Sequence, residues 1–327
     1  MRNRSSLIVV AALMLLPGAS PAAQRETDSE KFPTRPVRII VPNTAGSAMD
    51  VVTRIFSQRF SEIWGQQVVV DNRAGASGII GNEIAAKSGA DGYNLLFGSS
   101  AGLITVPLIQ KVPYDSFRDF APISLIVVSP QMLVASPSLP ATNINELVAL
   151  ARAKPRAIHC ASPGNATANH LGCETLKVMT GVEITHVPYK GTAPAITDVM
   201  GGQVQFMFNS MPAVYPLAKA GKLRAIGHGG AKRSPAAPEV PTIAESIPGF
   251  QCTTWYAMLA PRGVPPAIIA KINADMVKML SDPPFAKKLT DGGQEPAATT
   301  PAELTRFMRE ETDRFAKIIK AAGITSQ

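Results

Sequence analysis

Residues 37–50 read VRIIVPNTAGSAMD, a largely apolar run followed by a turn of small and polar residues. The next stretch, VVTRIFSQRF at 51–60, places apolar residues every three or four positions, which is the spacing of one helix face. The pattern predicts a strand over 37–41, a turn, and a helix over about 48–63. Such a turn keeps large side chains away from its backbone N–H groups. It is therefore either a plain connection or the floor of a binding site.

The same alternation of strand and helix continues along the chain. Further strands are predicted at 67–72, 93–98, 157–162, 183–189, 203–209, 223–229 and 254–261, with helices at 143–153, 168–180 and 192–200 and a helical end. Two more apolar runs lie within 123–136 and flank Ser129–Pro130. This layering is typical of an α/β protein. No stretch reads as a single linker, which favours two lobes joined by strands that cross more than once.

The first residues, MRNRSSLIVVAALMLLPGASPAAQ, have the three parts of a secretory signal peptide. Arg2 and Arg4 precede an apolar core, and Ser20-x-Ala22 is a small-x-small cleavage site, so we expect a signal peptide over 1–22 and an exported protein. The apolar core is too short to cross a bilayer. The net charge is +8, but the sequence contains no block of basic residues. We therefore interpret the charged residues as solvated surface and expect no nucleic-acid partner.

Three cysteines are present, at 160, 173 and 252. Export to an oxidising compartment permits a disulfide, and Cys160 with Cys173 is the plausible pair. The alternative is that both are small buried residues.

Four turns that follow predicted strands are rich in small polar residues. Open α/β sheets bind ligands at the carboxyl ends of their strands, so these turns are the candidate sites. They are NTAGSAMD (43–50), GSSAG (98–102), SPGNATANH (162–170) and NSMP (209–212). In the first turn, Ser47 and Asp50 fit a capping box in which Asp50 reaches back to the Ser47 N–H. A helix start of this kind also attracts an anion.

Two enzymatic or metal-dependent alternatives are weak. Gly98-x-Ser100-x-Gly102 matches a hydrolase nucleophile elbow, but the four histidines show no evident partner and too few strands precede the serine. His170-x-x-Cys173 matches no zinc spacing. No GxGxxG or P-loop occurs, so we expect neither metal nor cofactor.

Several motifs resemble the Bug family, the periplasmic substrate-binding proteins of tripartite tricarboxylate transporters. They include VPNTAGSAMD, VVVDNRAGASGIIGNEIAAKSGADGYNLLFG, KVPYDSFRDFAPIS, HVPYKGTAPAITDVMGGQVQFMF and TWYAMLAPRGVP, in the family's order. The resemblance extends from about Phe32 to Gly323. Family members commonly have VPFAPGGSTD at the first turn, whereas this chain has Asn43, Ala45 and Ser47 in place of the aromatic residue, the proline and the second glycine.

The resemblance implies an α/β type II periplasmic-binding fold: two lobes, joined by strands crossing near 123–136 and 252–261, with a ligand cleft between them. Lobe one would comprise 24–125 and 257–327, and lobe two 126–256. The ligand would be a small organic carboxylate, delivered by a monomer to the membrane subunits of the transporter. A sensor protein that serves a signalling receptor would have the same pocket, and a secreted serine hydrolase using Ser100 is the third alternative.

The resemblance and the turns together predict the ligand-binding residues. They are Asn43, Thr44, Ala45, Gly46, Ser47, Asp50, Ser99, Ser100 and Ala101 from lobe one, and Ser162, Gly164, Asn165, Ala166, Thr167 and Asn209 from lobe two. Asn209 stands where the family commonly has aspartate. For Asp50 two roles stay open: its charge is spent on backbone N–H groups, or it faces the cleft and favours a ligand with an ammonium or hydroxyl group.

Overall fold

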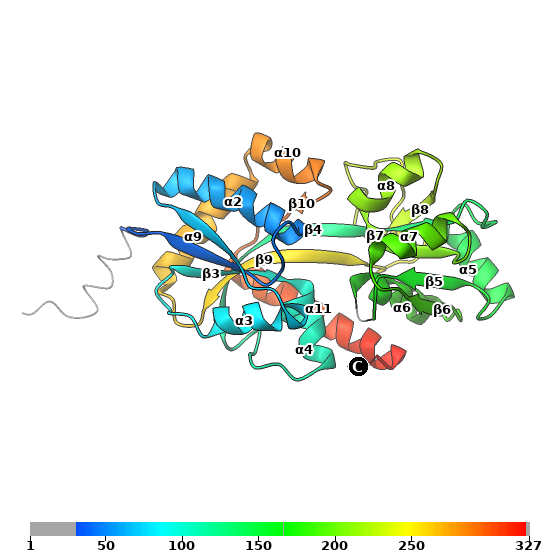
Figure 1. Ribbon diagram of the computed structural model, residues 1–327, viewed down its shortest axis with the longest axis horizontal. Coiled ribbons are helices and arrows are strands. Elements are labelled where there is room, and N and C mark those ends of the chain that lie inside the picture. The colour runs from blue at the N-terminus through cyan, green and yellow to red at the C-terminus, as the bar shows by residue number, and fades with distance from the viewer. Residues whose placement is uncertain (1–30, 166, 325–327) are drawn as a thin grey trace, which may run out of the picture.

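Two long strands run through the middle of the molecule and join its two halves (Figure 1). They are β4 (Phe120–Ala135) and β9 (Thr253–Pro261), which pair antiparallel with each other. The computed structural model describes residues 31–165 and 167–324. The predicted signal peptide at 1–22 and the predicted ligand residue Ala166 lie outside the described residues.

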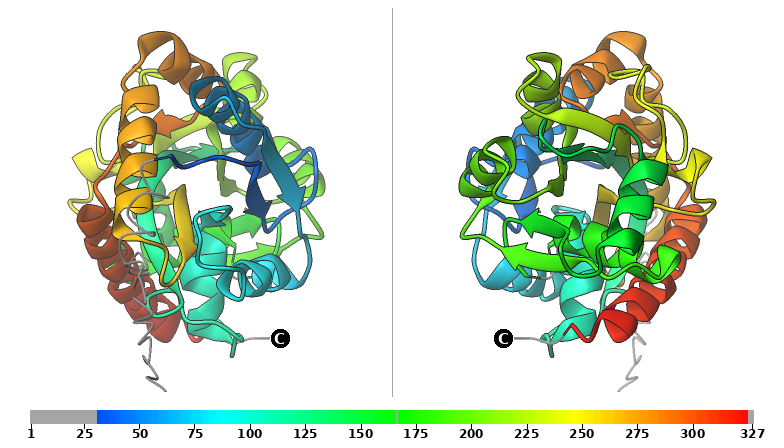
Figure 2. Two further views of the ribbon diagram at one scale, coloured as in Figure 1. Left: turned by 90° about the vertical axis from the view of Figure 1, so that its left-hand side faces the viewer. Right: turned by 90° about the vertical axis from the view of Figure 1, so that its right-hand side faces the viewer.

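Lobe one is built on three parallel strands beside β9. Strand β1 (Val37–Val41) lies between β2 (Val68–Asn72) and β3 (Asn94–Ser99), and β3 pairs antiparallel with β9. The remaining elements are α2 (Ala48–Trp64), η1 (Ala76–Gly78), α3 (Ile79–Ala86), η2 (Ala101–Thr105), α4 (Val106–Ile109), α9 (Pro266–Leu280), α10 (Pro283–Asp291), β10 (Glu295–Pro296) and α11 (Pro301–Ala322). Figure 2 shows helices on both faces of this sheet.

Lobe two continues the sheet from the far half of β4. Strand β7 (Phe206–Ser210) pairs with β4, and β5 (His159–Ser162) lies between β7 and β6 (Thr185–Pro188), parallel to both. The remaining elements are α5 (Ile144–Ala153), α6 (Ala168–Thr180), α7 (Thr192–Met200), α8 (Met211–Lys219), β8 (Arg224–His228) and η3 (Ile243–Glu245). The lobe boundaries predicted at 125/126 and 256/257 stay a prediction.

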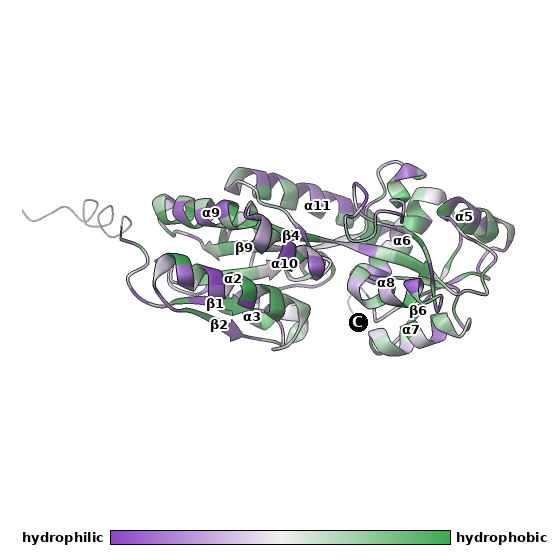
Figure 3. Cartoon of the chain, turned by 90° about the horizontal axis from the view of Figure 1, so that it is seen from above, coloured by the Kyte–Doolittle hydropathy of each residue, from purple (hydrophilic) through white to green (hydrophobic). Residues whose placement is uncertain are grey.

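Each lobe buries its own apolar clusters. In lobe one, Phe56 and Phe60 of α2 are fully buried against the sheet, as their helical spacing predicted. In lobe two, Phe206 and Phe208 of β7 pack under α6. Figure 3 shows hydrophilic and hydrophobic residues alternating along α11, the pattern of a helix packed by one face.

The two apolar runs that flank Ser129–Pro130 belong to one continuous strand, β4, at the place where the resemblance implied a crossing strand. Proline lacks the N–H that a ladder needs. On one edge of β4, however, β10 ends its pairing at Val128 and β7 begins its pairing at Gln131. Pro130 falls in the gap between these two partners and still pairs with Thr253 of β9 on the other edge. The missing N–H therefore interrupts no hydrogen bond.

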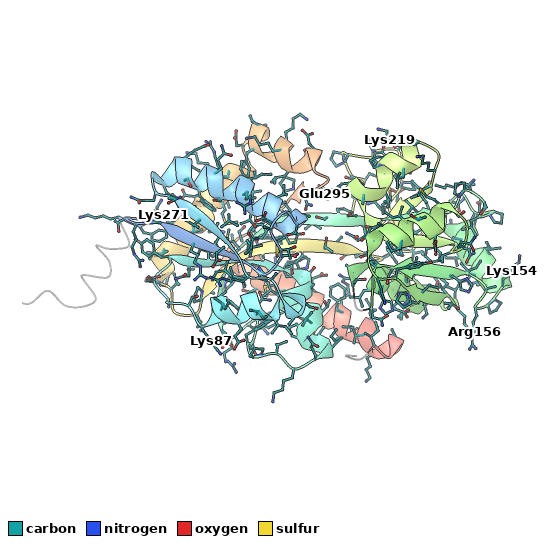
Figure 4. The ribbon with its side chains drawn as sticks, in the orientation of Figure 1. Lys87, Lys154, Arg156, Lys219, Lys271 and Glu295 are labelled. Carbon is teal, nitrogen blue, oxygen red and sulfur yellow. A yellow bond between two sulfur atoms is a disulfide. The ribbon has the colours of Figure 1, made fainter. Side chains whose placement is uncertain are left out.

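Glu295 lies between the two lobes, beside the crossing strands (Figure 4). It belongs to β10 of lobe one, and its Oε1 is buried with no hydrogen-bond partner among the described residues. Burial raises the pKa of Glu295, although a hydrogen bond to Ser234 and the charge of Lys232, both from lobe two, oppose the increase. The ionised carboxylate is thus poorly accommodated in this arrangement of the lobes.

Replacing Glu295 with glutamine should stabilise the protein at neutral pH and have little effect in acid. A raised pKa means that the folded state keeps its proton longer than the unfolded chain, so stability falls as pH rises above the unfolded value of about 4.3. Glu295→Gln removes that loss. Thermal unfolding of both proteins from about pH 4 to 8 measures it, with the exposed Glu310→Gln as control. A gain of equal size at both ends of the range would contradict the role of ionisation.

Candidate functional site

The turn between β1 and α2 leads into the first turn of the helix, and the side chain of Asp50 hydrogen-bonds to its backbone. Ser47 is the N-cap of α2, and its Oγ accepts from the Asp50 N–H at 3.2 Å, as predicted. The predicted return contact is wrong: Asp50 Oδ2 accepts from Gly46 N–H at 2.8 Å rather than from Ser47 N–H. The reason is that Ser47 N–H already donates to the Thr44 carbonyl within the tight turn.

The carboxylate of Asp50 is buried, with 2% of the residue exposed, and its charge is fully engaged. Besides Gly46 N–H, it accepts from Arg54 Nε at 2.9 Å and from Asn72 Nδ2 at 3.0 Å. Burial by itself would raise the pKa of Asp50, but these hydrogen bonds outweigh it and hold the pKa below its usual value. Of the two roles left open for Asp50, the structure therefore shows the first, a charge spent inside the protein.

The other residues of this turn are accessible. Asn43, Thr44, Ala45 and Gly46 are exposed, and Asn43 Oδ1 accepts from the Thr44 N–H at 2.8 Å. The first two N–H groups of α2, those of Ala48 and Met49, have no acceptor within the helix. The N–H groups open to an anion are therefore these two, rather than those of Gly46 and Ser47.

Asn72 is a supporting residue that the sequence analysis did not single out. From the end of β2, its Nδ2 reaches both Asp50 Oδ1 and the Asn43 carbonyl, at 3.0 and 3.2 Å. Helix α3 also lies tight against the turn, because a Cβ on Gly81 would come within 2.7 Å of Pro42 Cα. Asn72 and Gly81 both belong to the run DNRAGASGIIG at 71–81. The small residues of that run were the feature of the sequence that could have indicated close packing against the first turn.

The turn after β3 is closely packed and has no catalytic geometry. Ser100 is 5% exposed and has unstrained helical torsions (φ −50°, ψ −40°), whereas a nucleophile elbow is strained. Ser99 Oγ accepts from Gly102 N–H at 3.3 Å, and Ala101 is exposed. All four histidines lie in the other lobe, so none belongs to this turn to activate Ser100.

In lobe two, the turn after β5 is folded by its own side chains. Ser162 Oγ accepts from Gly164 N–H at 3.2 Å and lies 2.8 Å from the Gly164 carbonyl. Thr167 is the N-cap of α6, accepting from His170 N–H at 3.3 Å and donating to the Gly164 carbonyl at 2.8 Å. Asn165 is exposed at the tip of the turn. The turn thus presents backbone and an amide while its hydroxyls face inward.

The histidines do have partners, contrary to the sequence analysis. His186 Nε2 lies 2.7 Å from Ser162 Oγ, and the rings of His186 and His170 stack with centroids 3.8 Å apart. Burial, with a further contribution from the adjacent His170, lowers the pKa of His186 to about 4, so the His186 ring is neutral near pH 7. Glu174 faces His170 at 3.5 Å. A serine–histidine contact is one way to activate a nucleophile, but Ser162 is wholly buried, so a substrate cannot reach it.

Asn209, the last of the predicted ligand-binding residues in the chain, is the next-to-last residue of β7. Its side-chain Oδ1 accepts from the Ser210 N–H at 2.7 Å, and the residue is 4% exposed. Its Nδ2 has no hydrogen-bond partner among the described residues.

Cys160 and Cys173 form a disulfide, which decides between the alternatives left open by the sequence. It links β5 to α6 and encloses the turn from Ser162 to Thr167. Because Cys173 is bonded to Cys160, its sulfur is not available as a thiolate ligand beside His170. Among residues 31–165 and 167–324, no group of three potential metal-binding side chains occurs.

The third cysteine, Cys252, should be inert in the folded protein. It is buried beside the Ala168 carbonyl, and burial raises the pKa of its thiol to about 12 against the opposing charge of Arg314. Only the thiolate reacts with alkylating agents. We expect iodoacetamide at about pH 8 to leave the native protein unlabelled and to add a single label in denaturant without reductant. Rapid labelling of native protein, measured by mass spectrometry, would contradict this burial.

In Figure 1 the turns after β1 and β5 lie on the inner sides of the two lobes, facing each other. The structure thus brings exposed backbone of one lobe opposite the disulfide-bonded turn of the other. A surface pocket lined by Phe32, Tyr93 and Ile268 lies among other residues of lobe one and involves none of these turns. In the described part of the chain, no helix has the length and hydrophobicity needed to span a membrane.

A family model described as "Tripartite tricarboxylate transporter family receptor" matches residues 52–324. Among curated relatives, Protein BugT of Bordetella pertussis is 33% identical over 324 residues, which covers 98% of each chain.

Solved structures agree with this match. The protein "R. palustris Rpa4515 with adipate" is 38% identical, with a TM-score of 0.76 over 90% of this chain and 99% of that one. "MatC (Rpa3494) from Rhodopseudomonas palustris with bound malate" is 29% identical, with a TM-score of 0.71 over 88% of this chain and 100% of that one. The predicted two-lobe periplasmic-binding fold is therefore confirmed.

Proposed function

Because the chain belongs to the tripartite tricarboxylate transporter receptor family, the Bug proteins, we propose that it delivers a small organic carboxylate to transporter subunits in the membrane. The family consists of periplasmic solute-binding receptors rather than enzymes. Two relatives hold adipate and malate, so a carboxylate is the ligand class that fits best. The signal peptide predicted at 1–22 would export the chain, and it would act as a monomer.

The observation that carries the proposal is the first strand–helix turn. Asp50 already uses its charge on Gly46, Arg54 and Asn72, so it does not repel an anion above the turn. Ala48 and Met49 are the first two residues of the long helix α2, and the N–H groups at a helix N-terminus favour a negative charge. We assign one ligand carboxylate to this position, with the exposed residues 43–46 beside it.

The turns of lobe two would hold the far end of the ligand. The exposed Asn165 would contribute its backbone and amide, and helix α6 starts shortly after it. Thr167, as its N-cap, satisfies one N–H and leaves others of the first turn open. Ser99 to Ala101 would complete the wall on the side of lobe one.

A thermal-shift screen of mono-, di- and tricarboxylates, followed by calorimetry on the best hit, tests the function. A ligand that binds only the folded state raises the melting temperature. At a ligand concentration of a hundred times Kd, the free energy of unfolding increases by about 2.7 kcal/mol. Amines and neutral sugars of similar size serve as controls. If these stabilise the protein and no carboxylate does, the proposed function is wrong.

A further inference from the structure

One asparagine in each lobe lies near the carboxyl end of a strand. Asn43 lies between β1 and α2 in lobe one, and Asn209 is the next-to-last residue of β7, just before α8, in lobe two. Each side chain folds forward onto the backbone of the next residue. Asn43 Oδ1 accepts from Thr44 N–H at 2.8 Å, and Asn209 Oδ1 accepts from Ser210 N–H at 2.7 Å. Both asparagines thus lie near the carboxyl end of a strand, the edge at which open α/β sheets bind ligands.

This contact fixes which end of each amide is left for a ligand. A backbone N–H can donate only to the oxygen of a carboxamide, so the oxygen must face the chain and the NH2 group must face away. The reasoning depends on the position of the backbone N–H, since oxygen and nitrogen of an amide are otherwise hard to tell apart. Both asparagines therefore offer hydrogen-bond donors.

The environments of the two donors differ in a useful way. Asn43 is exposed, so a ligand can reach its NH2 group directly. Asn209 is buried, and its Nδ2 has no partner among the described residues. An unsatisfied buried donor is unfavourable, and an acceptor that arrives with a ligand would relieve it. The lobe-two donor is thus the one whose hydrogen bonding is incomplete.

We propose that the amides of Asn43 and Asn209 select ligands with hydrogen-bond acceptors at both ends, namely dicarboxylates, over ligands that carry an ammonium group at the far end. The proposal rests on the proposed function, because it concerns the same site. An ammonium offers only donors, and it would meet the NH2 group of Asn209 as donor against donor. The uncharged amide also supplies no carboxylate to attract it.

Three ligands of one length separate the contributions of the two ends. Adipate, hexanoate and 6-aminohexanoate differ only in the far group, and succinate and glutarate with their matching ω-amino acids extend the series. By calorimetry we expect the dicarboxylate of the best length to bind at least about tenfold more tightly than its ω-amino acid, as for loss of a charged hydrogen bond. The monocarboxylate should fall between them.

Substitutions at the two asparagines test the assignment. In Asn209→Asp the carboxylate keeps the cap on Ser210 N–H but replaces the donor by an acceptor. We expect dicarboxylate affinity to fall at least about tenfold and ω-amino-acid affinity to rise. Asn209→Ala should lower the affinity for the dicarboxylate without raising the affinity for the ω-amino acid. Asn43→Asp, at an exposed position that tolerates change, should weaken the dicarboxylate in the same way.

Asn145→Asp, on the exposed surface of α5, is the matched control and should leave all affinities unchanged. Melting curves without ligand establish that each variant folds. If Asn43→Asp and Asn209→Asp both keep the wild-type ratio of dicarboxylate to ω-amino-acid affinity within about twofold, the selection by amides is wrong while the receptor function stands. If the wild-type protein binds no carboxylate, the proposed function and this inference are both wrong.

Discussion

Replacing Cys160 and Cys173 together by alanine should lower the free energy of unfolding by about 2–5 kcal/mol. The disulfide closes a loop with a sequence separation of 13 residues and so restricts the unfolded chain. Both cysteines are fully buried, which adds a smaller loss of packing. Urea unfolding of wild type and the double variant measures the difference through the transition midpoints.

The same change should weaken ligand binding, because the loop contains the turn from Ser162 to Thr167. Without the link, the hydrogen bond from Thr167 Oγ1 to the Gly164 carbonyl and the stacked histidines remain to hold that turn on α6. A reducing agent should move wild-type protein toward the double variant and leave the variant itself unchanged. Cys252→Ala, which removes a buried sulfur but no cross-link, is the control. A double variant as stable as Cys252→Ala would show that the disulfide contributes nothing.

Gly46→Val should reduce the affinity for the best carboxylate by about ten- to a hundredfold or more. Space is not the obstacle, since a Cβ at Gly46 would meet no heavy atom within 4 Å. The obstacle is the backbone, because Gly46 has φ +79° and valine rarely adopts a positive φ. The turn would have to refold, and Gly46 N–H would leave Asp50 Oδ2. The start of α2 would then lose its present position.

Gly221→Val is a matched control for this prediction. Gly221 has φ +70°, also has no heavy atom within 4 Å of a Cβ, and lies between α8 and β8, away from the predicted ligand residues. Both variants should lose similar stability by thermal unfolding, whereas only Gly46→Val should lose binding by calorimetry. Normal binding by folded Gly46→Val would mean that the turn is only a connection.

Much of the fold followed from local pattern. The helical spacing of Phe56 and Phe60 predicted α2 to within a residue or two, and the capping of α2 by Ser47 followed from its type and place. The continuity of β4 through Pro130 depends on a neighbour, because the pairing of β4 with β9 carries the strand past the proline.

The sequence by itself determined which turns consist of small polar residues and which family the chain belongs to, because both can be recognised from contiguous residues. Only the tertiary structure decided what those turns do with their polar groups. Asp50 depends on Asn72 from the next strand, Ser162 on His186 from the neighbouring strand, and Cys160 on Cys173 from the helix. The physical reason is that a parallel sheet sets side by side residues separated by a whole helix in the chain, and hydrogen bonds form only at distances near 3 Å.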